Sequence, residues 1–173
     1  FFETMPKLRH VVEVTNPNQL AFATQTTLSV DDTNAILTIL KNRFPNIKGP
    51  TAEDICYATT NRQEAVKSLA KICDCILVIG AENSSNSLRL VEVALSNGVK
   101  NSFLIPHERA LDDFLNTYDP IQFPNIGLTA GASAPETLVQ ALIEKLKTNF
   151  NVNEINNEVI KENITFNLPK ILR

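Results

Sequence analysis

Residues 75–80 read Cys-Ile-Leu-Val-Ile-Gly, and residues 83–87, which follow closely, read Asn-Ser-Ser-Asn-Ser. A short apolar run rich in Ile and Val is typical of a buried strand. The polar residues after it are types that begin helices, and a helical pattern continues over residues 86–96. The stretch therefore predicts a strand, a loop and a helix, which is the beginning of a parallel βαβ unit.

The same order of elements recurs on both sides of this stretch. Further strands are predicted at residues 20–24, 54–57, 102–105 and 126–129, and further helices at residues 33–44, 62–72, 108–117 and 134–150. Strands that alternate with helices favour an α/β fold with right-handed βαβ units and a parallel sheet. An alternating pattern at residues 164–168 predicts a late strand that pairs with another part of the protein.

Breaks in the pattern suggest how the chain is divided. Pro45 and Gly49-Pro50 interrupt it early, and an Asn-rich polar stretch begins near residue 150. We expect residues 1–50 to be the C-terminal part of one α/β lobe, residues 51–150 to be a complete α/β lobe, and residues 151–173 to be a polar linker and tail strand. The chain opens on Phe1 rather than Met, in what reads as the end of a strand, so we expect the N-terminus to be a cut.

Composition excludes several classes of protein. The 173 residues are 43% hydrophobic and 20% charged, with a formal net charge of −3, which is ordinary for a soluble globular protein. The basic residues are spread along the chain, so no nucleic-acid groove is expected. No apolar run approaches the roughly 20 residues of a membrane helix. Three cysteines, an odd number, without an evident signal peptide indicate a cytoplasmic protein.

Polar or small residues follow several of the predicted strands, where open parallel sheets bind their ligands. Thr-Gln-Thr-Thr at residues 24–27 offers hydroxyls that either bind an anion or cap a turn. The five residues at 83–87, which include Ser84, Ser85 and Asn86, either form a redundant helix cap or bind an anion. Five such residues exceed what a cap needs, and a helix N-terminus favours an anion such as a diphosphate.

The loop at residues 129–136 combines a structural and a functional pattern. Ser133 and Glu136 have the spacing of a capping box, and Pro135 suits a first helical turn. Gly131 would also let a ligand approach the backbone closely. The loop has no lysine, which argues against a nucleoside triphosphate.

The cysteines divide into two kinds. Cys56 lies in the segment at residues 54–59, at the same edge of the sheet, so it is either a core residue or a thiolate, metal ligand or nucleophile. Cys73 and Cys75 would point to the same face of a strand, where we expect small apolar fillers. His10 and His107 are expected at the surface.

Four segments resemble the LytB family of 4-hydroxy-3-methylbut-2-enyl diphosphate reductases. They are TQTTLSVDDT at residues 24–33, DICYATTNRQEAV at residues 54–66, NSSNS at residues 83–87 and TAGASAP at residues 129–135. They occur in the family's order with natural spacing, and together they span most of the chain. Such long motifs make the resemblance specific.

The resemblance implies a reductive removal of the substrate hydroxyl, which gives isopentenyl and dimethylallyl diphosphates. It implies a [4Fe–4S] cluster on three cysteines, with Cys56 as one ligand, and Thr26 in a catalytic proton relay. The residues similar to the family's diphosphate ligands are Ser84, Ser85, Asn86 and Ser133. The implied fold has three α/β lobes, of which this chain would hold the end of one and all of another.

The same resemblance implies that the chain is incomplete and inactive alone. The family's other two cluster cysteines, two histidines and an acidic proton donor precede the matched segments. An N-terminal part of the same enzyme and an electron donor of the ferredoxin or flavodoxin type are therefore the expected partners, together with the allylic diphosphate. Two alternatives remain open, a non-catalytic α/β module that binds anions and an interaction domain whose loops are only caps.

Overall fold

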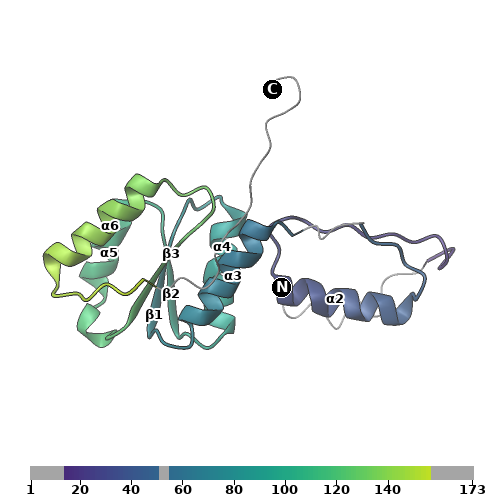
Figure 1. Cartoon of the computed structure of the whole chain (residues 1–173), viewed down its shortest axis with the longest axis horizontal. Helices are drawn as coiled ribbons and strands as arrows, with labels where there is room; N and C mark the ends of the chain where they lie inside the picture. Colours follow the sequence, from purple (N-terminus) through teal and green to yellow (C-terminus); the bar gives the residue numbers. More distant parts are fainter. Residues whose placement is uncertain (1–13, 51–54, 157–173) are drawn as a thin grey trace, which may run out of the picture. The chain divides into compact units, whose positions relative to one another are not determined.

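The computed structural model describes residues 14–50 and 55–156 of the chain (Figure 1). The chain divides into two compact units, Phe1–Cys56 and Tyr57–Arg173. The boundaries predicted at residues 50 and 150 stay predictions. The expected cut at the N-terminus and the strand predicted at residues 164–168 lie outside the described residues. None of the helices that the structure describes is long and apolar enough to cross a membrane.

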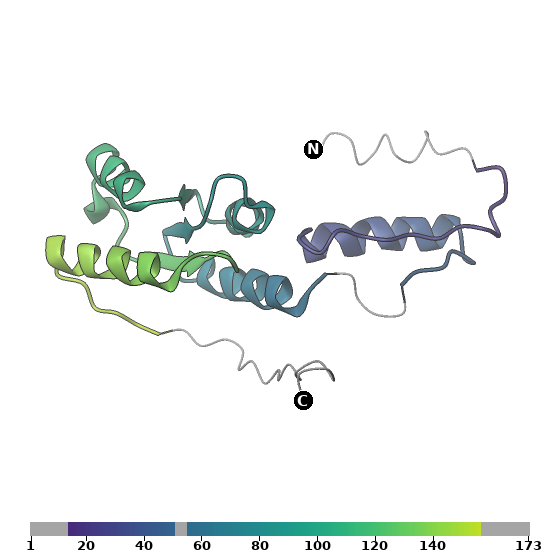
Figure 2. The same ribbon diagram turned by 90° about the horizontal axis from the view of Figure 1, so that it is seen from above.

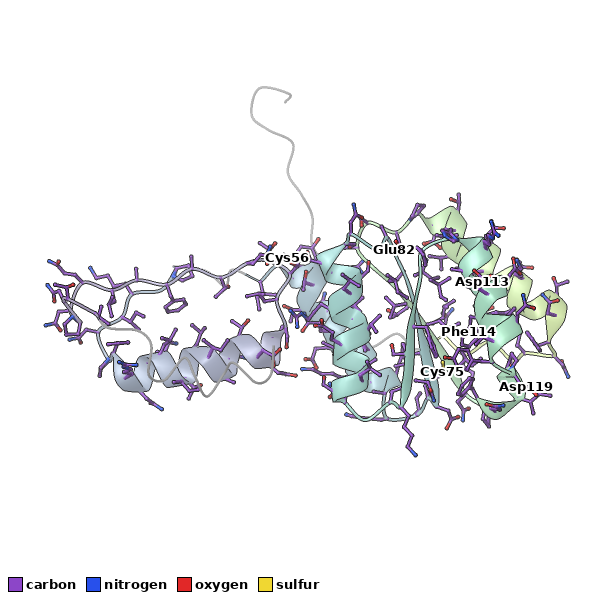
Figure 3. The ribbon with its side chains drawn as sticks, turned by 180° about the vertical axis from the view of Figure 1, so that it is seen from behind. Cys56, Cys75, Glu82, Asp113, Phe114 and Asp119 are labelled. Atoms are coloured by element: carbon purple, nitrogen blue, oxygen red, sulfur yellow. The ribbon has the colours of Figure 1, made fainter. Side chains whose placement is uncertain are left out.

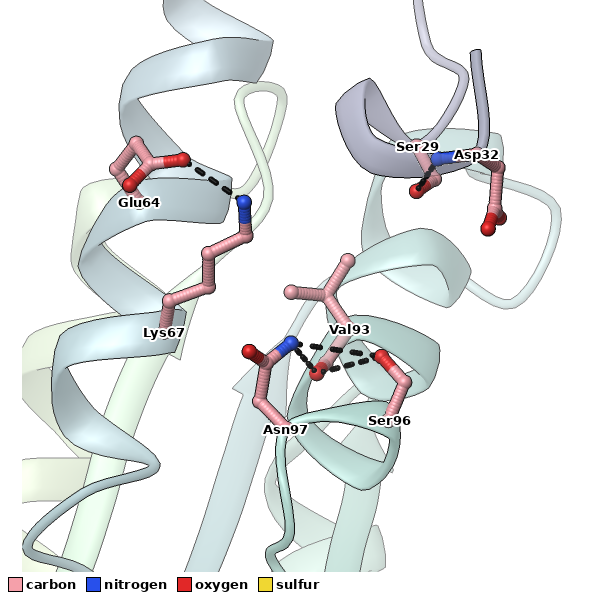
Figure 4. Close-up of polar contacts among 7 residues, drawn as sticks. All are labelled: Ser29, Asp32, Glu64, Lys67, Val93, Ser96 and Asn97. Atoms are coloured by element: carbon pink, nitrogen blue, oxygen red, sulfur yellow. Dashed lines mark hydrogen bonds and ion pairs between the residues drawn. The ribbon is translucent and has the colours of Figure 1, made fainter. Parts of the chain in front are cut away.

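The first unit is built around helix α2, Val30–Arg43. Ser29 caps it by accepting a hydrogen bond from the Asp32 N–H at 3.2 Å (Figure 4). Asp31 and Asp32 lie in its first turn, as the sequence predicts, where a negative charge interacts favourably with the positive end of the helix dipole.

The strand predicted at residues 20–24 is reduced to an isolated parallel bridge between Ala21 and Lys48. Phe22 donates to the Lys48 carbonyl and Lys48 donates to the Leu20 carbonyl, each at 2.9 Å. Pro50 follows two residues later and has no N–H with which to extend the ladder.

The second unit contains a parallel sheet, as the sequence predicts. Its strands are β1 (Cys75–Ile79), β2 (Asn101–Ile105) and β3 (Ile126–Ala130), and the described residues form a 3-stranded sheet in the order β2-β1-β3. Cys75 is in register with Asn101 on one side and with Ile126 on the other. All residues of β1 are buried, because it is the central strand and is covered on both faces.

Helices cover both faces of this sheet (Figures 1 and 2). Helices α5 (Glu108–Thr117) and α6 (Glu136–Asn149) pack on one face, where Leu77, Phe114 and Leu142 are buried together. Helices α3 (Tyr57–Leu69) and α4 (Ser85–Ser96) cover the other, around Val66, Ile76 and Leu90. A short 3-10 helix, Pro120–Gln122, precedes β3. The result is a three-layer α/β/α arrangement, in which each buried aliphatic side chain contributes about 1.5–3 kcal/mol.

The prediction of a strand at residues 54–57 is wrong for the described residues, because Ile55 and Cys56 belong to no strand and Tyr57 is the first residue of α3. Asp54 lies outside the described residues. The buried positions of α3 are Thr59, Gln63 and Val66, which recur at helical spacing. Two of the three are polar residues, so a search for apolar periodicity places the helix too late.

Helix α4 ends where the sequence predicts, next to Gly98. This glycine has a φ of 98°, a left-handed conformation that side chains disfavour. The Asn97 side-chain amide and the Ser96 hydroxyl both donate to the Val93 carbonyl, at 2.8 and 3.0 Å (Figure 4). The C-terminal turn of α4 is therefore capped by side-chain hydrogen bonds from Ser96 and Asn97.

Candidate anion site at the carboxyl edge of the sheet

Neighbouring strands β1 and β3 send their following helices to opposite faces of the sheet. Helix α4 follows β1 and packs with Val66 and Ile76, whereas α6 follows β3 and packs with Leu77. In open α/β sheets, the carboxyl ends of two strands whose following helices diverge in this way are the usual ligand position. The Gly131 N–H donates to the Ile79 carbonyl at 2.8 Å, so the two loops begin side by side.

The loop after β1 forms a turn and then begins α4. The Ser84 N–H donates to the Ala81 carbonyl at 3.0 Å, and Ser84 is the N-cap residue of the helix. Its Oγ atom accepts from the Ser87 N–H at 3.3 Å and from the Ser87 hydroxyl at 3.0 Å. Ser85 is exposed in the first turn, where N–H groups without helical partners give a partial positive charge.

Asn86 is the most unusual residue of this loop. Its exposed fraction is 7%, yet neither its amide nitrogen nor its amide oxygen has a hydrogen-bond partner. A buried amide without partners costs on the order of 1–3 kcal/mol. A β-carbon built on Gly131 would lie 3.7 Å from the Asn86 Nδ2 atom, so the amide lies beside the second loop. An orphaned polar group between two loops indicates that a polar ligand completes its hydrogen bonds.

The second loop joins β3 to α6, and the predicted capping box in it is wrong. The N-cap residue is Pro135, which makes no side-chain cap, and Glu136 instead accepts a hydrogen bond from Gln140 at 2.8 Å. Ala134 donates to the Gly131 carbonyl at 3.0 Å, a turn that places Ser133 at an exposed corner. Since the hydroxyl of Ser133 is not used to cap α6, it is available to a ligand.

Thr26 and Cys56 both belong to the first unit, and the structure brings them together. The Cys56 N–H donates to the Thr26 carbonyl at 3.4 Å, and both residues are exposed. Cys56 also immediately precedes the first residue of α3. The predicted thiol and the predicted hydroxyl are therefore neighbours, although they are 30 positions apart in the sequence.

Cys73 and Cys75 lie apart from any ligand edge, and the prediction that they share a face is wrong. Cys75 opens β1 at the end opposite to Glu82 and is buried among the residues beneath α5 and α6 (Figure 3). Cys73 packs on the other face, because it precedes the strand and does not follow its alternation.

Burial also suppresses the thiolate form of these two residues. It raises the pKa of Cys75 to about 12, with smaller effects from the neighbouring Cys73 and Asp74, and it raises the pKa of Cys73, with a smaller effect from Asp74. Metal ligation by cysteine needs the thiolate. Within residues 14–50 and 55–156, no group of three or more His, Cys, Asp or Glu side chains could hold a metal ion.

Ser87 and Gly80 belong to these loops, but their sequence pattern did not single them out. Ser87 is fully buried, and a β-carbon on Gly80 or on Gly131 would overlap its hydroxyl. A signal was present, because Ser87 ends the polar run that begins at residue 83, but a serine inside a helix gives no hint of a contact with another loop.

Comparison with known proteins places the chain among a family of related sequences. The model of the family described as LytB protein matches residues 3–147. A 4-hydroxy-3-methylbut-2-enyl diphosphate reductase from Methylococcus capsulatus is 50% identical over 97% of this chain and 52% of its own length. One from Roseobacter denitrificans is 50% identical over 94% of this chain and 50% of its own length.

A solved structure gives the same result for the fold. The E-1-hydroxy-2-methyl-but-2-enyl-4-diphosphate reductase from Plasmodium falciparum is similar with a TM-score of 0.79 and 33% identity, over 92% of this chain and 50% of that one. The chain thus spans about half the length of the relatives that it matches.

Proposed function

Because the chain belongs to the LytB family, we propose that it is the C-terminal part of a reductase that acts on 4-hydroxy-3-methylbut-2-enyl diphosphate. The reaction consumes two electrons and two protons, breaks the bond from carbon to the hydroxyl oxygen and releases water. The products are isopentenyl and dimethylallyl diphosphates, so the protein would serve isoprenoid synthesis by the non-mevalonate route. The names of its relatives and the chemistry of its loops support this proposal.

The diphosphate would bind at the carboxyl edge of β1 and β3. The observation that carries this assignment is the buried Asn86 amide, whose nitrogen and oxygen have no partner. The exposed Ser85 and Ser133 would add hydroxyl donors, and Ser84 would add a third at the start of α4. Each hydrogen bond to a charged phosphate is worth about 1.5–3 kcal/mol. Neutral donors hold the anion without a permanent ion pair, which helps the product to leave.

Cys56 would supply one thiolate to a [4Fe–4S] cluster, since it is exposed, unlike Cys75, and sits next to the start of a helix. The described residues offer no second thiol suited to that role, because Cys73 and Cys75 are held as thiols by burial. The remaining ligands would come from the rest of the full protein. When bound, such a cluster would supply the two electrons and Lewis-acid assistance to the departure of the substrate hydroxyl.

Thr26 would act beside that thiol. Its backbone carbonyl accepts from the Cys56 N–H, which keeps the threonine within reach of whatever Cys56 binds. Its hydroxyl would hold and pass the proton that the leaving hydroxyl group needs. An electron donor of the ferredoxin or flavodoxin type would deliver the electrons in the cytoplasm.

A titration of the chain with inorganic diphosphate tests the anion site. We expect saturable amide shifts in NMR spectra at residues 83–87 and 131–136, with a dissociation constant no better than roughly 1 mM, about −4 kcal/mol. The weak affinity follows from a pocket of neutral donors. Saturable shifts confined to other residues would contradict the site.

A second experiment tests the proposed incompleteness. We expect anaerobic reconstitution with iron and sulfide to give neither a stoichiometric cluster nor turnover, because a cubane cluster takes several cysteine thiolates. In the full-length protein, Cys56→Ser should lose the absorbance of the cluster and keep the far-UV circular dichroism. A brown, active preparation of this chain alone would overturn the assignment.

A further inference from the structure

Ser87 occupies an unusual place for a helical serine. It is fully buried at the third position of α4, and its side chain fills the space between Gly80 of one loop and Gly131 of the other. A β-carbon at Gly80 would lie 3.9 Å from the Gly131 nitrogen, so the two loops approach each other at this point. The Ser87 hydroxyl is thus enclosed by both loops and has no route to bulk solvent.

The hydrogen bonds of Ser87 point to one neighbour. Its N–H and its hydroxyl both lie within hydrogen-bond distance of Ser84 Oγ, at 3.3 and 3.0 Å. A hydroxyl oxygen has two lone pairs and one proton. When both lone pairs of Ser84 accept from Ser87, the proton of Ser84 has to point away from Ser87.

We propose that Ser87 is a positioning residue of the anion site, which acts through Ser84. The inference rests on the proposed function, since it concerns how the same loops bind the diphosphate. Ser87 holds Ser84 as a donor, so the chain of hydrogen bonds runs from Ser87 to Ser84 to a phosphate oxygen. Each bond in such a chain polarises the next, which strengthens donation to the anion.

A separate observation supports a ligand at these loops. The side chain of Asn86 precedes Ser87, is 93% buried and has no partner for either polar atom. It lies against the same Gly131 that encloses Ser87. Gly80 and Gly131 therefore have a common role, because a side chain at either position would displace the Ser87 hydroxyl from Ser84.

The test is a double-mutant cycle on the 173-residue chain with inorganic diphosphate as the probe. NMR titration measures the dissociation constants of the unmodified chain, Ser87→Ala, Ser84→Ala and the double variant. Ser96→Ala is the matched control, because it removes a hydroxyl hydrogen bond to the Val93 carbonyl at the other end of the same helix (Figure 4). Thermal unfolding of every variant is recorded in parallel.

We expect Ser87→Ala to weaken diphosphate binding about 5-fold when Ser84 is present and less than about 1.5-fold when Ser84 is replaced by alanine, because coupled residues give non-additive effects. Ser96→Ala should leave the dissociation constant unchanged. An equal loss in both backgrounds would overturn the positioning role and leave the anion site standing. If the unmodified chain does not bind, or if Ser84→Ala and Asn86→Ala both bind normally, the proposed anion site and this inference fall together.

Discussion

The two ends of the strand pair β1 and β3 are chemically opposite. At the amino end, Asp74 and Asn125 satisfy each other, since the Asn125 N–H and side-chain amide donate to Asp74 at 3.0 and 3.2 Å and the Asp74 N–H donates back at 2.8 Å. At the carboxyl end, the Asn86 amide is buried without a partner. Matched polar groups stabilise the fold, whereas the unmatched amide marks a place where binding energy is still available.

The largest effect we expect concerns the amino end of the strand pair, where Cys75 begins β1. Its pKa of about 12, against an ordinary 9.0, lowers the thiolate fraction at pH 8 by about 1,000-fold. Iodoacetamide at pH 8, followed by mass spectrometry, should label the exposed Cys56 while Cys75 stays unmodified until guanidinium unfolds the chain. Native labelling of Cys75 within 10-fold of Cys56 would show that this end opens readily.

The same shift has a consequence for stability. A thiol whose pKa is higher in the folded state than in the unfolded state binds its proton more tightly when folded. Its stabilising contribution is therefore complete below about pH 9 and is lost as the pH rises toward 12. The midpoint of urea unfolding should fall over that range, and Cys75→Ala should lessen the fall.

The next effect concerns the carboxyl end of the strand pair, where Asn86 lies. Asn86→Ala should weaken diphosphate binding by about 10-fold or more, because a hydrogen bond to a charged group is lost. The free energy of unfolding should stay within about 0.5 kcal/mol or rise, since the variant removes an amide that is buried without partners. Titration and urea unfolding measure the two quantities. A clear loss of stability would mean that Asn86 has a structural partner in solution.

Asp74→Ala is the matched change at the amino end, and it should lower stability while leaving diphosphate affinity unchanged. It removes two hydrogen bonds to a carboxylate that is itself exposed, so we expect a loss of about 1 kcal/mol in the free energy of unfolding. Diphosphate affinity should remain within 2-fold of the original. If the affinity falls in step with the stability, the two ends are not independent.

The difference between the two ends was only partly visible in the sequence. The apolar run at residues 75–80 and the alternation of strands and helices predict the parallel α/β fold, because burial on both faces selects such residues. The polar loops after β1 and β3 are predicted as ligand loops for a different reason, since parallel strands carry their ligands at one edge. Residue type and order along the chain suffice for these features.

What the sequence could not show depends on contacts between distant residues. The partnerless state of Asn86, the enclosure of Ser87 by two glycines and the pairing of Asp74 with Asn125 all join separate loops. Local patterns also gave a wrong prediction at Ser133 and Glu136, whose capping-box spacing describes a helix with its N-cap at Ser133, whereas the N-cap of α6 is Pro135. The roles of Thr26, Cys56 and the diphosphate ligands stay predictions.

The smallest effect we expect comes from Ser133, and it tests the corrected reading of the second loop. A true N-cap serine costs about 1 kcal/mol of stability when it is replaced by alanine. Since Pro135 begins α6 and Ser133 makes no cap, Ser133→Ala should leave the free energy of unfolding unchanged within about 0.3 kcal/mol. Ser29→Ala, which removes the genuine cap of α2, is the positive control for that measurement.

Diphosphate binding by Ser133→Ala should weaken only about 3-fold, because one exposed hydroxyl donor is lost and water replaces part of its contribution. A loss of stability equal to that of Ser29→Ala would mean that Ser133 does cap α6. Unchanged diphosphate binding would mean that Ser133 is not part of the anion site, which would then consist of the loop after β1 alone.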